Sequence, residues 1–421
     1  MTKILIVGNH CCSNRGDAAI LRGLIDFIEE EYPNFSVDIT SRYVDGAKWF
    51  FNNTVHNDIL AKEKDKYKSI SGKIKNRLIN NFLLPIYIKG GIDSKKFLPK
   101  SYENFSNFIN KYDFVIQVGG SFFVDLYGVS QFEAAAVCIR EKKPILMVGH
   151  SVGPFKNKNI SKIAKDVFKN VDSLILRESV SEEHLYEIGL THDNFILGGD
   201  TAWLINPDKY EFNISPLLSK YVDSRPTIAI TVRELAPFDV RLGISQDDYE
   251  EKMANLCEYL IGKGYNIIAV STCTGFDSYH RDDRISALRI GRIINNAERY
   301  TVVMDELTDV ELGKLLSKCT LTIGTRLHSA ILSMRFGTPA FAIYYEHKSL
   351  GILKKIGLIE YSVAIHDIAT SDFKNIVLRK LENIEHEQEK LASQVHVEAE
   401  NCKSVIREAF SNLLGKDNQY G

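Results

Sequence analysis

The sequence predicts an α/β protein made of two doubly wound units, each with its own parallel sheet. Short apolar runs alternate with helix-length segments over almost the whole chain. The runs are nearly all apolar, which is typical of parallel strands buried on both faces. A length of 421 residues suits two domains of similar size. With 44% hydrophobic and 25% charged residues, the composition is that of a globular protein and excludes fibrous and disordered classes.

Five strands are expected in each unit. Those of the first unit span residues 4–7, 114–118, 145–148, 173–176 and 195–197. Those of the second unit span residues 227–232, 266–270, 302–304, 321–323 and 339–344. A polar stretch separates the two sets. We therefore expect a domain of residues 1–205, a linker of residues 206–225 and a domain of residues 226–421.

Charge, apolar runs and cysteines restrict the compartment and the partners. The chain carries 52 Lys and Arg against 54 Asp and Glu, so it lacks the overall basic field expected for binding nucleic acid. The apolar run at residues 4–7 is too short for a signal peptide and no run of about 18 apolar residues follows, which indicates a cytoplasmic protein. The seven cysteines include no C-x-x-C pair. Because adjacent side chains such as those of His10, Cys11 and Cys12 rarely converge on one ion, neither a disulfide framework nor a metal site is expected.

One segment of the first domain has a strong local charge. Residues 62–100 carry eleven Lys and Arg but only three acidic residues, and the apolar run at residues 82–88 lies among them. Basic charge beside exposed apolar side chains favours peripheral contact with an anionic membrane surface. The alternative is a solvated insertion that is held by a small buried anchor.

The motif Gly-Thr-Arg-Leu-His-Ser at residues 324–329 is the strongest chemical signal. Apolar residues recur at helical spacing from Leu327 onward, so a helix is expected to begin here with Thr325 as its cap. A helix N-terminus binds anions, and Arg326 adds a bidentate donor for phosphate or carboxylate. Because an arginine in the first turn opposes the helix dipole, Arg326 points to an anionic ligand. His328 is a candidate for proton transfer, with a satisfied core histidine as the alternative.

Further candidates lie where other expected strands end, because ligands of doubly wound sheets bind beyond the carboxyl ends of the strands. Arg233 follows the first strand of the second unit, and two arginines would suit a doubly anionic substrate. A surface salt bridge with Glu234 or Asp239 is the alternative for Arg233. In the N-terminal loop, Asn14 and Arg15 are expected to be available to a ligand, whereas Asp17 is expected to cap a helix.

Several enzyme classes can be weighed on their motifs. The loop after Gly8 lacks G-x-G-x-x-G and the chain has no P-loop motif, which disfavours dinucleotide enzymes and P-loop ATPases. Gly-His-Ser-Val-Gly at residues 149–153 matches the nucleophile elbow of hydrolases, and the chain order allows a triad of Ser151, Asp200 and His328. The following segment, residues 154–159, delays the helix that an elbow requires. A serine hydrolase is therefore a minor alternative.

Four segments together resemble the polysaccharide pyruvyl transferases. They are Gly-Asn-His at residues 8–10 with Asn-Arg-Gly-Asp at 14–17, Gln-Val-Gly-Gly-Ser-Phe-Phe at 117–123, Gly-His-Ser-Val-Gly-Pro at 149–154, and the motif at 324–329. Three more are similar to the colanic acid (WcaK/AmsJ) branch of that family. They are Asp-Leu-Tyr-Gly at residues 125–128, Arg-Glu-Leu-Ala-Pro-Phe at 233–238 and Ser-Thr-Cys-Thr-Gly at 271–275. The resemblance covers essentially the whole chain.

The resemblance implies a fold of two Rossmann-like domains that face a cleft, as in GT-B glycosyltransferases. It implies that phosphoenolpyruvate is a co-substrate, that no further cofactor is needed, and that the pyruvyl group passes to a sugar as a cyclic ketal. We expect this sugar to be a galactose of an exopolysaccharide repeat unit on a lipid-linked oligosaccharide. The sequence does not indicate the oligomeric state.

The resemblance also implies roles for particular residues. Arg326, Leu327 and His328 match the family's R-L-H motif, which lines the donor site, and Arg233 is our candidate for the second donor-binding arginine. His328 is the expected catalytic residue. The first domain is expected to bind the acceptor. Six residues are candidates for acceptor or cleft contacts: Asn14, Arg15, Asp17, Ser121, Ser151 and Lys348.

Two other functions remain open from the sequence. The main alternative is a nucleotide-sugar glycosyltransferase on the same fold. Many retaining members of that class use a Glu-x7-Glu pair, but here Glu346 is followed eight residues later by Lys354. A non-catalytic carbohydrate-binding protein is a further possibility, but binding alone gives no reason for Arg, Leu and His together at a helix N-terminus.

Overall fold

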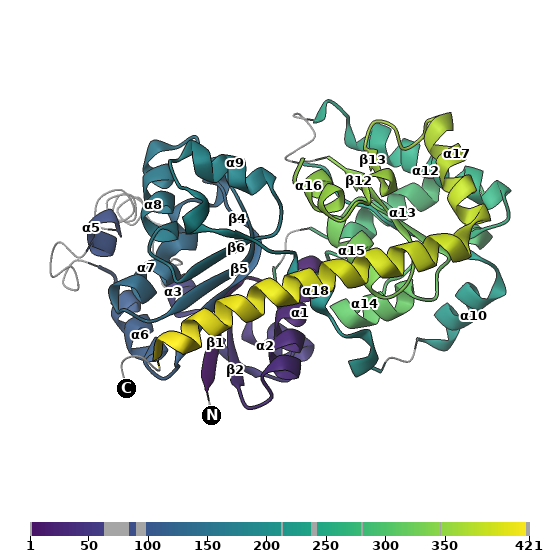
Figure 1. Ribbon diagram of the computed structural model, residues 1–421. Helices are drawn as coiled ribbons and strands as arrows, with labels where there is room; N and C mark the ends of the chain where they lie inside the picture. The colour runs from purple at the N-terminus through teal and green to yellow at the C-terminus, as the bar shows by residue number, and fades with distance from the viewer. Residues whose placement is uncertain are drawn as a thin grey trace. The chain divides into compact units, whose positions relative to one another are not determined.

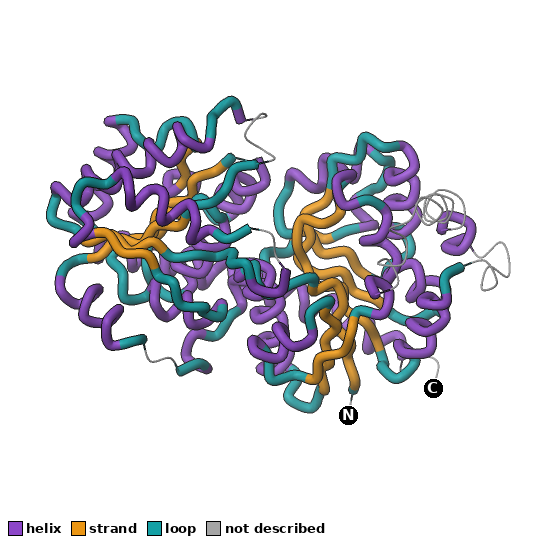
Figure 2. Tube along the Cα trace, turned by 180° about the vertical axis from the view of Figure 1, so that it is seen from behind, coloured by secondary structure: helices purple, strands orange, loops and turns teal. Residues whose placement is uncertain are grey.

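The computed structural model describes residues 2–62, 84–89, 98–211, 214–236, 242–278, 281–345 and 347–417. The chain forms two compact units. Unit 1 comprises Met1–Cys11, Ile20–Leu204 and Ala399–Gly421, and unit 2 comprises Cys12–Ala19 and Ile205–Glu398. Each unit has a parallel sheet between layers of helices, as Figures 1 and 2 show. The predicted α/β class with two Rossmann-like units is confirmed.

The described part of unit 1 contains a seven-stranded sheet in the order β3-β2-β1-β4-β5-β6-β7. Its strands are β1 (Lys3–Asn9), β2 (Ser36–Ser41), β3 (Thr54–Asn57), β4 (Phe114–Phe123), β5 (Ile145–Val152), β6 (Ser173–Leu176) and β7 (Ile196–Leu197). All pairings are parallel. The chain adds β2 and β3 on one side of β1 and then starts again with β4 on the other side. The switch point of this sheet therefore lies between β1 and β4.

Helices pack on both faces of this sheet because each has one apolar stripe. Those of unit 1 are α1 (Arg15–Glu31, from Ile20 onward), α2 (Val44–Phe50), α3 (Ile59–Lys62), α5 (Leu84–Lys89), α6 (Lys100–Ile109), α7 (Glu133–Arg140), α8 (Lys158–Phe168) and α9 (Val180–Glu187). In α8, Ile160, Ile163 and Val167 recur at helical spacing and enter the core. Asn157 caps this helix through the amide groups of its first turn.

Unit 2 repeats the same plan in a sheet of the order β10-β9-β8-β11-β12-β13. Its strands are β8 (Thr227–Thr231), β9 (Asn266–Ala269), β10 (Tyr300–Val302), β11 (Leu321–Gly324), β12 (Ala340–Tyr344) and β13 (Ser362–Ala364). Its helices are α10 (Pro216–Ser224), α12 (Gln246–Gly262), α13 (Asp283–Ile293), α14 (Asp309–Leu316), α15 (Leu327–Arg335), α16 (His347–Lys355) and α17 (Ser371–Glu382). The switch point lies between β8 and β11.

The domain limits differ from those that the sequence predicts. Residues 12–19, which include the first turn of α1, belong to unit 2. The stretch at 206–225 is not a separate linker, because it carries α10 and belongs to unit 2. The last helix, α18 (Ile384–Asp417), begins in unit 2, but its residues from Ala399 onward belong to unit 1.

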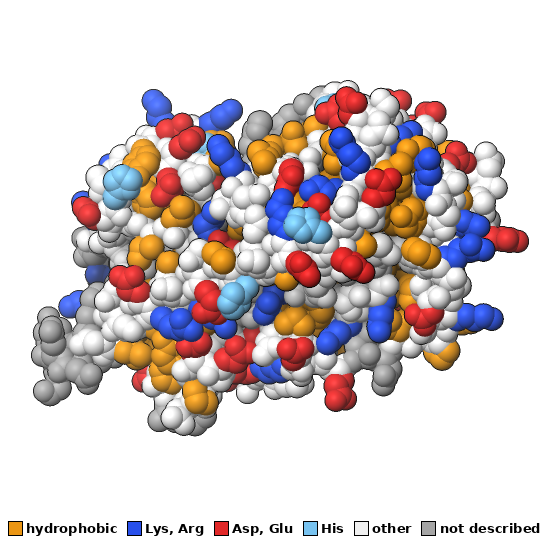
Figure 3. All heavy atoms as spheres, turned by 45° about the vertical axis from the view of Figure 1, so that its right-hand side comes forward, with side chains coloured by type: hydrophobic (Ala, Val, Ile, Leu, Met, Phe, Trp, Pro, Cys, Tyr) orange, Lys and Arg blue, Asp and Glu red, His pale blue; other side chains and the backbone are white. Residues whose placement is uncertain are grey.

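The structure describes only part of the basic segment. Residues 63–83 and 90–97, which carry most of its charge, lie outside the described residues. Among the described residues of the segment, Leu84 and Ile88 of α5 are buried in the core of unit 1. These two side chains are therefore not exposed for membrane contact. None of the described helices is long and apolar enough to cross a membrane. On the face drawn in Figure 3, acidic and basic side chains are interspersed.

Candidate active site

The Arg-Leu-His motif lies where β11 ends and α15 begins. Arg326, not Thr325, occupies the N-cap position, and its side chain does not cap the helix. Thr325 is fully buried, and its hydroxyl pairs with that of Tyr249 at 2.7 Å. The turn needs the small residue Gly324, because a Cβ there would lie 2.1 Å from the Ser329 hydroxyl oxygen. The predicted helix start is confirmed, but the predicted cap is wrong.

Arg326 is held by a buried carboxylate. Its Nη2 donates to Asp283 Oδ1 at 2.7 Å, and the Asp283 side chain is 1% exposed. Burial acts to lower the pKa of Arg326, but the Asp283 carboxylate, with Cys273 and Tyr345, raises it above its usual value overall. The Nε of Arg326 is buried and has no hydrogen-bond partner among the described residues. The guanidinium therefore keeps a donor that a ligand could use.

Arg233 lies two residues beyond β8 and is also buried. Its guanidinium lies over the Tyr345 ring, 4.7 Å from the ring centroid, and its Nη1 donates to the Tyr345 hydroxyl. The alternative of a surface salt bridge with Glu234 is not found, because the Glu234 carboxylate binds Arg281 at 2.7 Å and the Arg233 Nε donates to the Glu234 carbonyl. Asp239 lies outside the described residues.

Tyr345 lies at the same sheet edge as the two arginines. It contacts Arg233 directly, and its charge contributes to the raised pKa of Arg326. The three residues follow β8, β11 and β12, so they share the carboxyl edge of the unit 2 sheet, at its switch point. Sequence reasoning did not single out Tyr345. The signal was its position directly after an apolar strand.

His328 lies in the first turn of α15, beside the first turn of α1. A Cβ added to Gly16 would lie 2.7 Å from His328 Nδ1, so only a glycine lets the two helix ends approach this closely. Asn14 Oδ1 accepts from the Gly16 amide at 3.0 Å, as an N-cap does. Asp17 instead accepts from Asn14 Nδ2 at 3.1 Å. The cap is therefore Asn14, and the prediction that Asp17 caps this helix is wrong.

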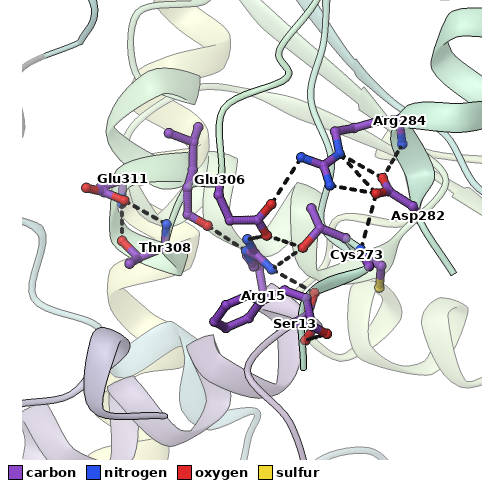
Figure 4. Close-up of polar contacts among 12 residues, drawn as sticks. Ser13, Arg15, Cys273, Asp282, Arg284, Glu306, Thr308 and Glu311 are labelled. Atoms are coloured by element: carbon purple, nitrogen blue, oxygen red, sulfur yellow. Dashed lines mark hydrogen bonds and ion pairs between the residues drawn. The ribbon is translucent and has the colours of Figure 1, made fainter. Parts of the chain in front are cut away.

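Arg15 does not have the role expected of it. Its side chain is 0% exposed, and its Nη2 lies 2.6 Å from Glu306 Oε1. Further donors bind the Leu307 and Ser13 carbonyls and the Thr274 hydroxyl (Figure 4). The expectation that Arg15 contacts an acceptor is therefore wrong, because its side chain is fully buried. Its structural role is to fix the start of α1 in unit 2.

A second polar cluster lies in unit 1 around Arg177, which the sequence analysis did not select. This buried arginine donates to Ser151 Oγ at 2.7 Å, to Ser121 Oγ at 2.6 Å and to Asp200 Oδ2 at 2.8 Å. Ser151 and Asp200 are buried. The two candidate serines are thus brought together, but by an arginine that follows β6 and not by a histidine.

This geometry does not support the serine hydrolase alternative. Ser151 lies inside β5, which continues to Val152, and α8 begins only at Lys158. A nucleophile elbow instead places its serine at an exposed turn directly before a helix. The neighbouring His150 donates from Nε2 to the Gln117 carbonyl at 3.0 Å, and burial lowers its pKa to about 4.

Two further candidate residues, Leu327 and Lys348, lie in the helices that follow β11 and β12. Leu327 is half-buried in the first turn of α15. Lys348 lies in α16, but its side chain is outside what the structure describes. Within the described residues, no group of three His, Cys, Asp or Glu side chains could hold a metal ion.

Comparison with known proteins identifies the family. The model of the polysaccharide pyruvyl transferase family matches residues 14–347. The chain belongs to this family. The transferase is 45% identical over 398 residues to the amylovoran biosynthesis protein AmsJ of Erwinia amylovora, and the match covers 94% of this chain and 96% of AmsJ. Both the resemblance to the family and that to its WcaK/AmsJ branch are confirmed.

Solved structures show the fold of this pyruvyl transferase. HepE from Anabaena, in complex with UDP and glucose, matches with a TM-score of 0.60 and 13% identity over 99% of this chain and all of HepE. The UDP-GlcNAc 2-epimerase of Neisseria meningitidis matches with a TM-score of 0.58 and 11% identity over 97% of this chain and 99% of the epimerase. At this identity the likeness shows the GT-B-like fold alone.

Proposed function

We propose that this transferase moves the pyruvyl group of phosphoenolpyruvate to a sugar of an exopolysaccharide repeat unit, forms a cyclic ketal and releases phosphate. One observation carries the proposal. Arg233, which is buried, and Arg326, whose side chain is 12% exposed, follow the neighbouring strands β8 and β11 at the sheet edge whose R-L-H motif also provides His328. Phosphoenolpyruvate has a phosphate and a carboxylate, and guanidinium groups bind both through paired hydrogen bonds.

The reaction needs a group that moves protons. The enol carbon of phosphoenolpyruvate takes up a proton, and one sugar hydroxyl attacks the resulting cationic centre and loses its proton. Phosphate then leaves, and a second hydroxyl of the sugar closes the ketal and loses its proton in turn. The imidazole of His328 is suited to accept a hydroxyl proton and to return it, because one ring nitrogen can accept a proton and the other can donate one.

The likeness to AmsJ, which is described as an amylovoran biosynthesis protein, supports an exopolysaccharide acceptor. We propose a galactose residue as the acceptor sugar, on a repeat unit that is attached to a lipid carrier at the inner face of the cytoplasmic membrane. The protein would then act from the cytoplasm.

Release of phosphate tests the proposal directly. The protein is incubated with phosphoenolpyruvate and a panel of methyl galactosides and galactose-containing oligosaccharides, and inorganic phosphate and the mass of the sugar are followed. We expect phosphate and a sugar whose mass has increased by one pyruvate less one water. UDP-galactose and UDP-glucose serve as the comparison donors. Consumption of a UDP-sugar, with phosphoenolpyruvate unchanged, would favour the glycosyltransferase alternative instead.

The role of His328 is tested by His328→Ala. We expect phosphate release to be lost while the Kd for phosphoenolpyruvate stays within about tenfold, because the imidazole moves protons and the arginines hold the anion. Stopped assays give the rate and calorimetry gives the affinity. If this variant keeps most of its kcat, His328 is not the catalytic residue.

A further inference from the structure

We infer that unit 1 holds the acceptor in a second binding site, a pocket at the switch point of its own sheet that takes one neutral sugar residue. This inference rests on the proposed function, because it assigns the acceptor of that reaction. It is carried by the described residues of unit 1 alone.

The pocket lies at the carboxyl ends of β1, β2 and β3, beside the middle of β4. Its empty space amounts to about 420 Å³ when the open solvent at its mouth is counted. His10, Arg42 and Asp58, which directly follow β1, β2 and β3, line it together with Gln117 from within β4. In doubly wound sheets the crevice between the strands that diverge at the switch point is where ligands bind. This pocket occupies that position between β1 and β4.

Gln117 provides an acceptor that the protein leaves without a donor. The residue is 5% exposed, and its Nε2 donates to the Gln131 carbonyl at 3.0 Å. This contact orients the amide, and its Oε1 is buried without a hydrogen-bond partner among the described residues. Buried polar atoms in native proteins are nearly always paired, by protein, water or ligand. A ligand hydroxyl entering the pocket would supply the missing donor.

The charges of the pocket favour a neutral ligand. Arg42 and Asp58 both line it, with Arg42 Nε 3.8 Å from Asp58 Oδ2. One cation and one carboxylate cancel, yet both retain exposed surface, at 38% and 24% of the side chain. The pocket thus offers donors and acceptors without net charge, as a polyhydroxyl ligand needs. The lack of net charge distinguishes this pocket from the pair of arginines in unit 2.

An aromatic surface continues the pocket at His10. The His10 ring packs edge-on against Phe122 at 4.2 Å between centroids, and Phe122 packs against Tyr127 at 5.6 Å. Tyr127 closes the short helical turn Asp125–Tyr127 and is 46% exposed. An exposed aromatic ring presents a flat apolar face with a polar tip. The C–H face of a sugar ring packs on such a surface while its hydroxyls reach polar groups.

Three variants test the site. Gln117→Leu removes the buried acceptor, Arg42→Leu removes an exposed charge with little risk to folding, and Tyr127→Ala removes the exposed ring. Tyr186→Ala is the matched control, because Tyr186 is a tyrosine of unit 1 with similar exposure, 40%, and its ring packs on His192 and Phe195 rather than on Phe122. Circular dichroism and thermal unfolding establish that each variant is folded.

Turnover with phosphoenolpyruvate and the galactoside that the wild type uses best gives the first measurement. We expect each of the three variants to raise the KM for the sugar at least about fivefold, and to leave the KM for phosphoenolpyruvate within about twofold. Tyr186→Ala should match the wild type. An unchanged sugar KM in both Arg42→Leu and Gln117→Leu would overturn the site.

Sugar binding without the donor gives a second, independent measurement. Saturation-transfer NMR with methyl galactoside, methyl glucoside and methyl mannoside should show transfer to at least one sugar, and Gln117→Leu and Tyr127→Ala should reduce it. If sugar binding follows this pattern but the protein does not consume phosphoenolpyruvate, the pocket is a sugar-binding site and the proposed reaction is wrong. If no sugar receives transfer in the wild type, or if UDP displaces the sugar from the wild type, the pocket is not an acceptor site.

Discussion

The two arginines of the proposed donor site differ in the protein groups that they contact. Arg326 balances the buried carboxylate of Asp283, whereas Arg233 packs on the ring of Tyr345. Arg326→Ala or Arg233→Ala should each weaken phosphoenolpyruvate binding by about 1.5–3 kcal/mol, the range for hydrogen bonds to charged groups, which is roughly 10- to 150-fold in Kd. Calorimetry measures this. Unchanged affinity in both variants would favour a different donor.

Arg326→Ala should also lower the melting temperature, because it leaves the Asp283 carboxylate buried without its cationic partner. Adding Asp283→Asn to Arg326→Ala should recover much of the lost stability but none of the affinity. This control separates the structural role of Arg326 from its role in binding. Recovery of affinity in the double variant would contradict the assignment of Arg326 to the donor.

His150 should make unit 1 sensitive to acid. Burial holds its pKa at about 4 in the folded chain, below the value of 6.5 expected when unfolded. The stability from the neutral ring is therefore fully present above pH 6.5 and is lost as the pH falls toward 4, because only the unfolded chain takes up a proton in that window. The loss should approach about 3 kcal/mol by pH 4. Urea unfolding at several pH values, with His150→Gln as the variant that lacks this component, measures it.

The sequence predicted candidate site residues where a polar or basic residue interrupts an apolar pattern. Arg326 and His328 were found because they stand at the start of an apolar helix, where a basic residue is unexpected. Arg15 was misjudged and Arg177 was overlooked, because a buried arginine looks like an exposed one in sequence. Its burial depends on partners far along the chain, such as Glu306 for Arg15 and Asp200 for Arg177.

At the level of elements, the close approach of α1 and α15 should be sensitive to one methyl group. Gly16→Ala would place its Cβ 2.7 Å from His328 Nδ1, so the ring must move. We expect kcat to fall by about tenfold or more while the affinity for phosphoenolpyruvate changes little, because a small misplacement of a catalytic group is costly. Gly262→Ala is the control, since a Cβ there meets nothing within 4 Å. A normal kcat for Gly16→Ala would show that His328 tolerates displacement.

The strands were predictable in proportion to their burial. Each of the ten expected strands has a counterpart, although β4 and β5 run on to Phe123 and Val152. The strand expected at residues 302–304 is displaced, because β10 (Tyr300–Val302) shares only Val302 with it. Three strands, β2, β3 and β13, were not predicted. The first alternates polar and apolar residues, and the other two are edge strands of four and three residues. A short strand at an edge is buried on fewer sides, so its sequence carries no continuous apolar run.

For the whole molecule, the return of α18 to unit 1 was not predictable from local pattern. Phe410 is fully buried there and packs against Phe27, Tyr32 and Phe114. Phe410→Ala should cost about 3–5 kcal/mol of unfolding free energy, as for other buried phenylalanines. In the same helix Val397 is 56% exposed, so Val397→Ala should change stability by less than about 0.5 kcal/mol. Equal effects in urea unfolding would mean that α18 is not part of the unit 1 core.

The division of α1 and α18 between the units constrains how such proteins can be recombined. The boundaries at residues 19/20 and 398/399 fall inside helices, so unit 1 is made of three separate stretches of chain. A chimera with a relative, joined at one point near residue 205, would separate unit 1 from the helix that carries Phe410 and unit 2 from Gly16. Unit 2 can therefore be exchanged intact only if residues 12–19 are exchanged together with residues 205–398. Residues 399–421 must then be kept with unit 1.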